Sequence, residues 1–242
     1  AEIGDNVSIG PFCVVGPKVS IGKNCVLKNN VIIDGNTQIG KECKFYPFSV
    51  IGMIPQDLKY EGEDAKLKIG EFNVFREHST VHIGTKLGGG TTVIGDHNLI
   101  MTGSHIAHDC LIGNNIILSH HVALAGHVKI DDHAILSAMV GVVQFRRIGK
   151  YAMIGGLCAV DTDVVPFSIA SPKESSRAYI SGANIIGMKR KGFKKQDINL
   201  VNKIYKLIFN KNLTMDEKIN KITSSNFSGN VFTEIFNFIN KE

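Results

Sequence analysis

An apolar residue recurs at every sixth position through the first two thirds of this chain, and this period constrains the fold more than any other feature. A short fixed period is typical of repeat architectures, and hexapeptide repeats are typical of parallel β-helices. An ordinary all-β sandwich with frequent turns is the alternative, but such folds do not hold one phase for so long. The two longest runs consist of Ile3, Ile9, Val15, Ile21, Leu27, Ile33, Ile39, Phe45 and Ile51, and of Ile94, Ile100, Ile106, Ile112, Leu118, Leu124, Ile130, Leu136, Val142, Ile148, Ile154 and Val160.

Six residues fit one side of a triangular coil, made of a short strand and a corner. The periodic residue should point inward, and three sides should make a coil of eighteen residues, so that residues eighteen apart stack at about 4.8 Å. Glycine often follows the periodic residue, as at Gly4, Gly10 and Gly22. We expect these glycines at corners, where positive φ and little side-chain space favour glycine.

The five cysteines, Cys13, Cys25, Cys43, Cys110 and Cys158, share one slot, four residues after the periodic residue. Neighbouring repeats place valine or alanine in that slot, so cysteine serves there as a small hydrophobic residue. The clustered spacing of a zinc site or a disulfide framework is absent. We therefore predict reduced core thiols, which are typical of a cytoplasmic protein.

The repeat divides the chain into two regions and is itself broken twice. We predict a β-helix over residues 1–165 with inserted loops near residues 53–68 and 84–93, and a helical region over residues 166–242. In the second region, the apolar spacing from Ile198 to Ile208 indicates a helix, and Thr214 with Glu217 predicts a capping box. Loops inserted into a rigid stack are natural places for substrate contacts, although harmless decoration is an equal alternative.

Charge divides along the same boundary. Residues 166–242 carry a net charge of +7 and the preceding residues −2, which together give the +5 of the whole chain. A basic segment favours an acidic protein or a phosphorylated ligand as partner, with a merely solvated surface as the alternative. Nucleic acid is disfavoured because the basic residues are not interleaved with aromatic ones.

No apolar stretch of the sequence is long enough for stable insertion into a membrane, and no secretory signal is evident. Ala1 already lies in the repeat register without a preceding methionine, so we expect the N-terminus to be trimmed or incompletely represented.

His108 is the strongest candidate for chemistry among the nine histidines. Gly126 lies eighteen residues later and should stack on His108, with His127 beside it. A histidine facing a glycine backbone can pair a general base with an N–H donor for an oxyanion, which is what acyl transfer requires. Asp109 could orient the ring. From the residues alone, a structural corner histidine is an equal alternative.

Other chemistries fit less well. A zinc site between β-helical subunits would need three imidazoles, and the histidine pair five residues apart that is typical of hexapeptide-repeat carbonic anhydrases is absent, so we predict no metal. No serine or cysteine has the surroundings of a nucleophile. No glycine-rich nucleotidyltransferase loop precedes the repeats.

The order of the motifs resembles the UDP-N-acetylglucosamine acyltransferases of lipid A biosynthesis over nearly the whole chain. The resemblance is carried by His105-Ile-Ala-His-Asp-Cys, Leu124-Ala-Gly-His-Val, Gln144-Phe, Gly187-Met-Lys-Arg-Lys-Gly-Phe, Gln56-Asp-Leu-Lys-Tyr and Gly88-Gly-Gly. It implies a left-handed β-helix, an exception to the usual right-handed crossover. It also implies a homotrimer that moves an (R)-3-hydroxyacyl chain from acyl carrier protein, which is acidic, to the 3-hydroxyl of UDP-N-acetylglucosamine without a cofactor.

The resemblance also implies roles for particular residues. His108 corresponds to the general base, Asp109 to its partner and the Gly126 N–H to the oxyanion donor. Gly156 corresponds to the position that limits acyl length, where glycine leaves room for a longer chain. The sugar and diphosphate are expected near Asp57, Lys59, His105 and His127, and the nucleotide or the carrier's pantetheine arm near Gln144, Asn184, Arg190 and Lys191.

Two positions depart from the family pattern. Val143 replaces a histidine before Gln144, and Ile186 replaces a glutamate two residues after Asn184. The loss of a polar group near the proposed oxyanion donor leaves transfer to a 3-amino UDP-sugar as an alternative. An acetyl-CoA-dependent acetyltransferase and a non-catalytic scaffold are further alternatives. The N-acyltransferase later in the same pathway carries an additional N-terminal uridine-binding domain, which we do not expect here.

Overall fold

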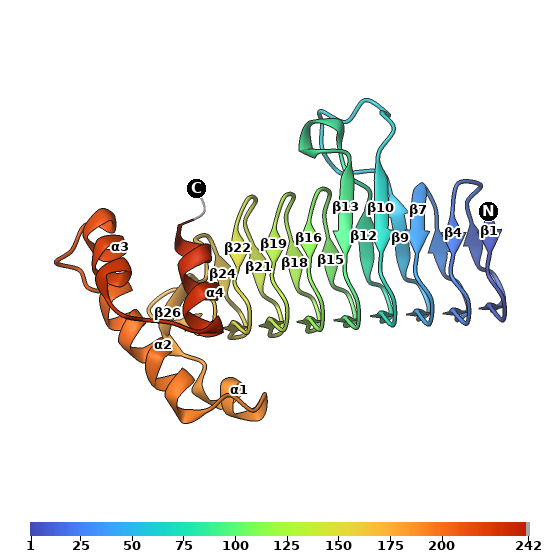
Figure 1. The fold of residues 1–242 in the computed structure, drawn as a ribbon. Coiled ribbons are helices and arrows are strands. Elements are labelled where there is room, and N and C mark those ends of the chain that lie inside the picture. The colour runs from blue at the N-terminus through green and yellow to red at the C-terminus, as the bar shows by residue number, and fades with distance from the viewer. Residues whose placement is uncertain (241–242) are drawn as a thin grey trace.

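The computed structural model describes residues 1–240, and residues 1–160 of it form a three-sided parallel β-helix (Figure 1). Each side is one parallel sheet, in which every strand pairs with the strand one coil away. The register is the predicted one, with Glu2 opposite Ser20 and Ile106 opposite Leu124. Residues eighteen apart therefore stack wherever no insertion intervenes.

The three sheets contain the following strands. Sheet A consists of β1 (Glu2–Ile3), β4 (Ser20–Ile21), β7 (Asn36–Ile39), β10 (Lys66–Ile69), β13 (Thr91–Ile94), β16 (Leu111–Ile112), β19 (Lys129–Ile130) and β22 (Arg147–Ile148). Sheet B consists of β2 (Ser8–Ile9), β5 (Val26–Leu27), β8 (Lys44–Phe45), β11 (Val74–Phe75), β14 (Leu99–Ile100), β17 (Ile117–Leu118), β20 (Ile135–Leu136), β23 (Met153–Ile154), β25 (Ser168–Pro172) and β26 (Ala178–Ala183). Sheet C consists of β3 (Val14–Val15), β6 (Ile32–Ile33), β9 (Val50–Met53), β12 (Thr80–His82), β15 (His105–Ile106), β18 (Ala123–Leu124), β21 (Gly141–Val142) and β24 (Ala159–Val160).

The periodic apolar residues fill the interior of the prism. From the second coil onward nearly all are buried, and Phe45 and Phe75 stack in neighbouring coils with their ring centroids 5.0 Å apart. Cys25, Cys43, Cys110 and Cys158 are buried and Cys13 is half-buried, all as free thiols, so the predicted core slot is confirmed. Each coil buries apolar surface against the coils beside it, so stability accumulates along the stack.

The expected reason for the glycines after the periodic residue was half wrong. These positions lack space, because a Cβ on Gly22 would lie 2.6 Å from the carbonyl carbon of Gly40 in the next coil. Apart from Gly52 (φ 83°), the glycines after a periodic residue do not have positive φ. The left-handed conformation falls two residues later instead, at nineteen non-glycine residues such as Asn24 (φ 58°) and His127 (φ 63°). Asparagine and aspartate tolerate this conformation best, and stacking between coils supports the aromatic residues there, as for Phe72 and His97.

Both insertions leave the prism at the same edge, where the chain passes from sheet C to sheet A; we call it the C–A edge. The first loop spans residues 54–65 and the second spans residues 83–90, which includes the short 3₁₀ helix η1 (Lys86–Gly88). Both end earlier than expected because β10 and β13 begin before the repeat register resumes. In Figure 1 they project together above β10, β12 and β13.

The region after Pro166 contains strands as well as helices. β25 extends sheet B in parallel to β23, and β26 pairs with β25 in the antiparallel direction. The sequence had suggested only helices here. The helices are α1 (Ile185–Arg190), α2 (Lys195–Ile208), α3 (Met215–Ser224) and α4 (Asn230–Ile239). They enclose a second core around Phe167, Met188 and Val201, and the Tyr205 hydroxyl donates to the carbonyl oxygen of Pro166.

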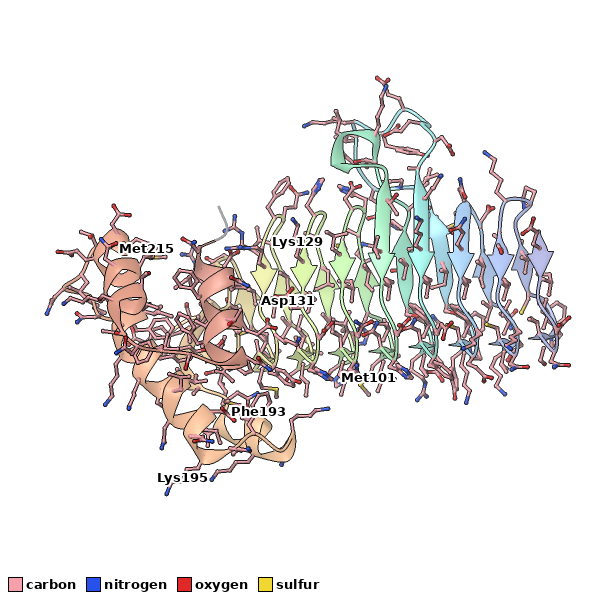
Figure 2. All side chains as sticks on the ribbon, viewed as in Figure 1. Met101, Lys129, Asp131, Phe193, Lys195 and Met215 are labelled. Atoms are coloured by element: carbon pink, nitrogen blue, oxygen red, sulfur yellow. The ribbon has the colours of Figure 1, made fainter. Side chains whose placement is uncertain are left out.

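The predicted capping box is present at the start of α3. The Glu217 N–H donates to Thr214 Oγ1 at 3.3 Å, and the Thr214 N–H donates to Glu217 Oε2 at 2.8 Å. Figure 2 shows side chains that project from the helical region, Lys195 among them, in line with the basic charge of this part of the sequence. Within residues 1–240, no helix is both long and apolar enough to cross a lipid bilayer.

Candidate active site

The C–A edge carries a buried pair formed by His108 and Asp109, between β15 and β16. The His108 side chain is 8 % exposed and the Asp109 side chain is fully buried, and His108 Nδ1 lies 2.8 Å from Asp109 Oδ2. Asp109 has φ 59°, and this left-handed corner directs its carboxylate under the second loop. A carboxylate only accepts hydrogen bonds, so the hydrogen of the neutral imidazole resides on Nδ1. The lone pair is then on Nε2, which is the arrangement that a general base needs.

Gly126 lies one coil from His108, as the register predicted. A Cβ on Gly126 would lie 2.5 Å from Cε1 and 2.7 Å from Nε2 of His108, so only glycine leaves room for the ring. The His127 N–H donates to the His108 carbonyl oxygen at 3.0 Å and fixes the two corners against each other. Within residues 1–240 the Gly126 N–H has no hydrogen-bond acceptor, so it is free to donate to a bound group.

His127 stands over Asp109 in the next coil. Its Nε2 lies 3.9 Å from Asp109 Oδ2, and its ring is perpendicular to that of His108 and stacked on Phe145. Burial lowers the pKa of His127, and the nearby carboxylates of Asp109 and Asp57 act in the opposite direction. The influence of Asp57 places the first loop close to this corner. The net lowering keeps His127 neutral at pH 7, able to donate or accept a hydrogen bond.

His105 and His82 lie on sheet C beside the pair. His105 Nδ1 is 2.7 Å from Thr80 Oγ1, and the His82 ring meets that of His105 edge-on at a centroid distance of 4.7 Å. Burial lowers the pKa of His105, with a further contribution from His108. Burial likewise lowers the pKa of His82 to about 4. His82 could not be selected over the other histidines from the sequence, because its burial has no counterpart in the six-residue pattern.

A groove of about 1110 Å³ lies over sheet A and reaches this corner. It runs from Gly88, Asp109 and His127 across β16, β19 and β22 to Phe238 of α4. At its far end α4 is held to the prism, since the Arg147 guanidinium lies over the Phe238 ring and Lys150 pairs with Glu234. The groove therefore gives a ligand access to His127 from the side of sheet A, while the Asp109 carboxylate stays buried.

His108, Asp109 and His127 also bring their possible ligand atoms within 4.8 Å of one another, which is close enough to hold a divalent cation. The register had predicted that these residues are neighbours, whereas the convergence of their ligand atoms is evident only in the structure. However, both oxygens of Asp109 already accept hydrogen bonds from Thr85, and Oδ2 is also bonded to His108. The protein thus uses this carboxylate to orient groups around it, which favours acid–base chemistry over coordination.

The other predicted residues lie on two edges of the prism and in the helical region. Lys59 is exposed on the first loop, where its N–H donates to Asp57 Oδ1, and Gln144 is exposed one coil above Gly126. Both therefore lie at the C–A edge. Gly156 lies at the edge between sheets B and C, where a Cβ would lie 3.1 Å from the Ala138 carbonyl oxygen. Val143 is half-exposed and stacks over Ala125, as expected.

The three predicted residues of the helical region lie away from His108. Asn184 caps α1 by accepting from the Gly187 N–H, and its Nδ2 donates to the Tyr151 carbonyl oxygen. Its polar atoms are thus already used within the chain. Arg190 and Lys191 are exposed at the end of α1, and the charge of Lys191 acts on His133, at the edge between sheets A and B. Within one chain these residues do not meet the His108–Asp109 pair.

Two protein-family models match parts of this chain. Residues 163–242 match the model described as UDP-N-acetylglucosamine O-acyltransferase, domain 2, and residues 1–35 and 91–126 match the bacterial transferase hexapeptide repeat. A curated protein of Thermodesulfovibrio yellowstonii, acyl-[acyl-carrier-protein]–UDP-N-acetylglucosamine O-acyltransferase, is 47 % identical over 222 residues, which are 92 % of this chain and 85 % of that protein.

Solved structures give the same result. The UDP-N-acetylglucosamine acyltransferase of Francisella novicida matches with a TM-score of 0.94 at 39 % identity, covering 98 % of this chain and 86 % of that one. The Arabidopsis enzyme of the same description matches with a TM-score of 0.85 at 29 % identity, covering 98 % and 91 %. These matches confirm the predicted fold, a left-handed parallel β-helix with a C-terminal helical region.

Proposed function

The chain belongs to the UDP-N-acetylglucosamine O-acyltransferase family, which transfers an acyl group from acyl carrier protein, and we propose that His108 is its general base. We further propose that the transferred group is an (R)-3-hydroxyacyl chain and that the acceptor atom is the 3-hydroxyl of the sugar, the first step of lipid A biosynthesis. The observation that carries the proposal is the stacking of Gly126 on the His108 ring, with Asp109 behind it.

The proposed reaction is a direct transfer. His108 Nε2 takes the proton of the sugar hydroxyl while that oxygen attacks the thioester carbonyl carbon. The carbonyl oxygen becomes an oxyanion and accepts a hydrogen bond from the Gly126 N–H. The intermediate then expels the carrier's sulfur, which recovers the proton from His108, so the enzyme returns to its starting state. Asp109 stabilises the imidazolium that exists between these two steps. The donor arrives already activated as a thioester, so the proposed steps need no cofactor.

The polar residues around the pair supply acceptor binding in this proposal. Asp57 and Lys59 come from one loop, and the Lys59 ammonium suits the diphosphate while the Asp57 carboxylate suits sugar hydroxyls. His105 and His127 are kept neutral by burial, so they can hydrogen-bond to the sugar without repelling a protonated His108. Gln144, one coil above Gly126, is placed for a contact with the nucleotide or with the carrier's pantetheine arm.

We propose a homotrimer, because the proposed site residues fall on two different edges of one prism and on helix α1. Gly156 at the edge between sheets B and C, and Arg190 and Lys191 on α1, cannot reach His108 within their own chain. Neighbouring copies that pack side by side about a three-fold axis would bring such edges together. The trimer would thereby join His108 of one copy to the acyl-limiting Gly156 and the basic α1 residues of another. Asn184 would act there by holding α1 in place.

The basic helical region supports acyl carrier protein as the donor, since that partner is acidic and the region carries +7. At Gly156 the absence of a side chain leaves the acyl path open, so we propose a long acyl chain. Four of the five thiols are buried in the core and none pairs with another within residues 1–240. Free thiols of this kind support a cytoplasmic location.

The test is acyl transfer from a mixed pool of 3-hydroxyacyl carrier proteins, with the product identified by mass spectrometry. UDP-N-acetylglucosamine and its 3-amino analogue are supplied separately to native protein and to His108→Ala. We expect the native protein to form the 3-O-acyl product with the longer chains and His108→Ala to be slower by about 10³-fold. Equal rates for the two proteins would overturn the role of His108. Preference for the amine would instead reassign the acceptor atom.

A further inference from the structure

Thr85, at the start of the second loop, is bonded to both oxygens of the Asp109 carboxylate. Its backbone N–H donates to Oδ1 at 2.9 Å, and its hydroxyl donates to Oδ2 at 2.7 Å. Thr85 is 5 % exposed, and both of its donors are directed to Asp109. Oδ2 is the same oxygen that holds His108 Nδ1. The two Thr85 donors therefore fix the plane of the carboxylate that sets the direction of the His108 ring.

The second loop is built around this contact. The Thr85 hydroxyl also accepts from the Gly88 N–H, and the Thr85 carbonyl oxygen accepts from the Gly90 N–H at 2.7 Å. Gly88 lies directly on the carboxylate, because a Cβ there would overlap the Asp109 side chain. The glycine triplet at residues 88–90 thus brings backbone down onto Asp109.

Burial of Asp109 is a result of this loop and is not general for the corner. Asp109, His127 and Phe145 occupy equivalent positions in successive coils. The Asp109 side chain has no exposed surface, whereas that of His127 is 23 % exposed and Phe145 is 60 % exposed. Of these three residues, the second loop covers only Asp109. Removal from water strengthens the interaction of a carboxylate with a developing imidazolium.

We propose that Thr85 is a positioning residue for the acyl transfer, which acts through Asp109 on the orientation and basicity of His108. This rests on the proposed role of His108 as the base. Asp109 could otherwise rotate about its side-chain bonds and present either oxygen, and the His108 ring would follow it. With Thr85 on both oxygens, one orientation remains, and Nε2 stays directed at the corner beside Gly126.

The test compares three Thr85 variants in the full-length enzyme. Thr85→Val removes the hydroxyl and keeps the β-branched shape, Thr85→Ser keeps the hydroxyl, and Thr85→Cys replaces it with a weak donor. The matched control is Thr37→Val, which removes another fully buried hydroxyl at the C–A edge, one that donates to the Asp34 carbonyl oxygen. His108→Ala is measured in parallel.

For Thr85→Val we expect a kcat lower by about tenfold, since one hydrogen bond to a charged group is lost. The KM for UDP-N-acetylglucosamine should stay within about twofold of native. The acid limb of the pH profile should move to higher pH, because Oδ2 then bonds the protonated ring without a competing donor. Thr85→Ser should restore both properties, and Thr37→Val should change neither.

A Thr85→Val enzyme with the kcat and pH profile of Thr37→Val would overturn the positioning role. If Thr85→Val does not fold, Thr85→Cys provides the test. We expect Thr85→Cys to lower kcat by about threefold. An unchanged kcat would contradict the positioning role. The two proposals fail differently. If His108→Ala is fully active, His108 is not the base and both proposals fail. If His108→Ala is inactive but Thr85→Val is unaffected, only the positioning role of Thr85 is contradicted.

Discussion

Gly126 faces the ring of His108 across one coil step, so closely that a Cβ would lie 2.5 Å from Cε1 and 2.7 Å from Nε2. This contact joins the two groups that acyl transfer needs, the base and the N–H donor. It exists because residues eighteen apart stack, and because the position above His108 has no side chain.

Gly126→Ala should reduce kcat by about 100-fold, because the added methyl group forces the His108 ring away from Asp109 and displaces the N–H donor. Steady-state kinetics with UDP-N-acetylglucosamine would measure the loss. Gly141→Ala is the matched control, since Gly141 lies one coil step from Ala123 on sheet C and a Cβ there meets open space. Comparable kinetics for the two variants would contradict the importance of the contact.

Asp109→Asn should lower kcat by about 10³-fold while the protein stays folded. The amide nitrogen can donate to His108 Nδ1, which moves the imidazole hydrogen to Nε2 and removes the lone pair that accepts the proton. ¹⁵N NMR of the imidazole would report the change of tautomer directly. A variant that kept native kcat and the native tautomer would show that Asp109 does not orient the base.

The buried His82 predicts a loss of stability in mild acid. Its pKa is lowered to about 4 in the folded protein and returns to about 6.5 on unfolding, so the unfolded chain binds more protons between these values. Stability should therefore be complete above pH 6.5 and should fall as the pH approaches 4. At pH 5 the loss from His82 is about 2 kcal/mol relative to pH 7.

Urea unfolding at pH 7 and pH 5 would measure this effect. His82→Leu should reduce the difference between the two pH values, and His120→Leu, at an exposed histidine, should leave it unchanged. An equal pH dependence in the native protein and in His82→Leu would contradict the assignment. His105 and His127, whose pKa values are lowered too, should add to the effect in the same direction.

Asn98→Ala should destabilise the prism by about 2–4 kcal/mol. Asn98 is 1 % exposed, and its side chain bonds the Gly113 carbonyl oxygen at 2.9 Å and the Ile116 N–H at 2.7 Å, both in the next coil. Removal of the amide leaves the buried Ile116 N–H and the partly buried Gly113 carbonyl oxygen unpaired. Thermal unfolding should show a clear decrease in Tm. Asn36→Ala, which removes one long bond of 3.5 Å at a partly exposed site, should have little effect.

The β-helix and its core could be predicted because they follow from a local rule that repeats. The inward position of Ile106, the core slot of Cys110 and the stacking of Gly126 on His108 all depend on the register alone. The left-handed residues could not be placed in the same way. The left-handed conformation is adopted by Asn24 in one coil and by His127 in another, because the backbone path of the corner determines it and the residue type does not.

The surroundings of the base were the harder part of the site to predict. Thr85 lies within the second loop and His82 directly before it, where the register stops and sequence separation no longer gives distance. Their contacts arise because both loops leave the prism at the same edge. This common edge was not predicted from the sequence. β25 and β26 were missed for a related reason, since their pairing with β23 and with each other does not follow the six-residue period.

The coil of eighteen residues also limits how this chain can gain or lose length. A deletion of one whole coil returns every later residue to its original side, whereas a deletion of six residues turns all that follows by one third of a revolution. If the six residues were lost between His108 and Gly126, Gly126 would move to a different side of the prism and would no longer face His108. Extra residues are harmless to this alignment only where they loop out and return to the same edge, as residues 54–65 and 83–90 do.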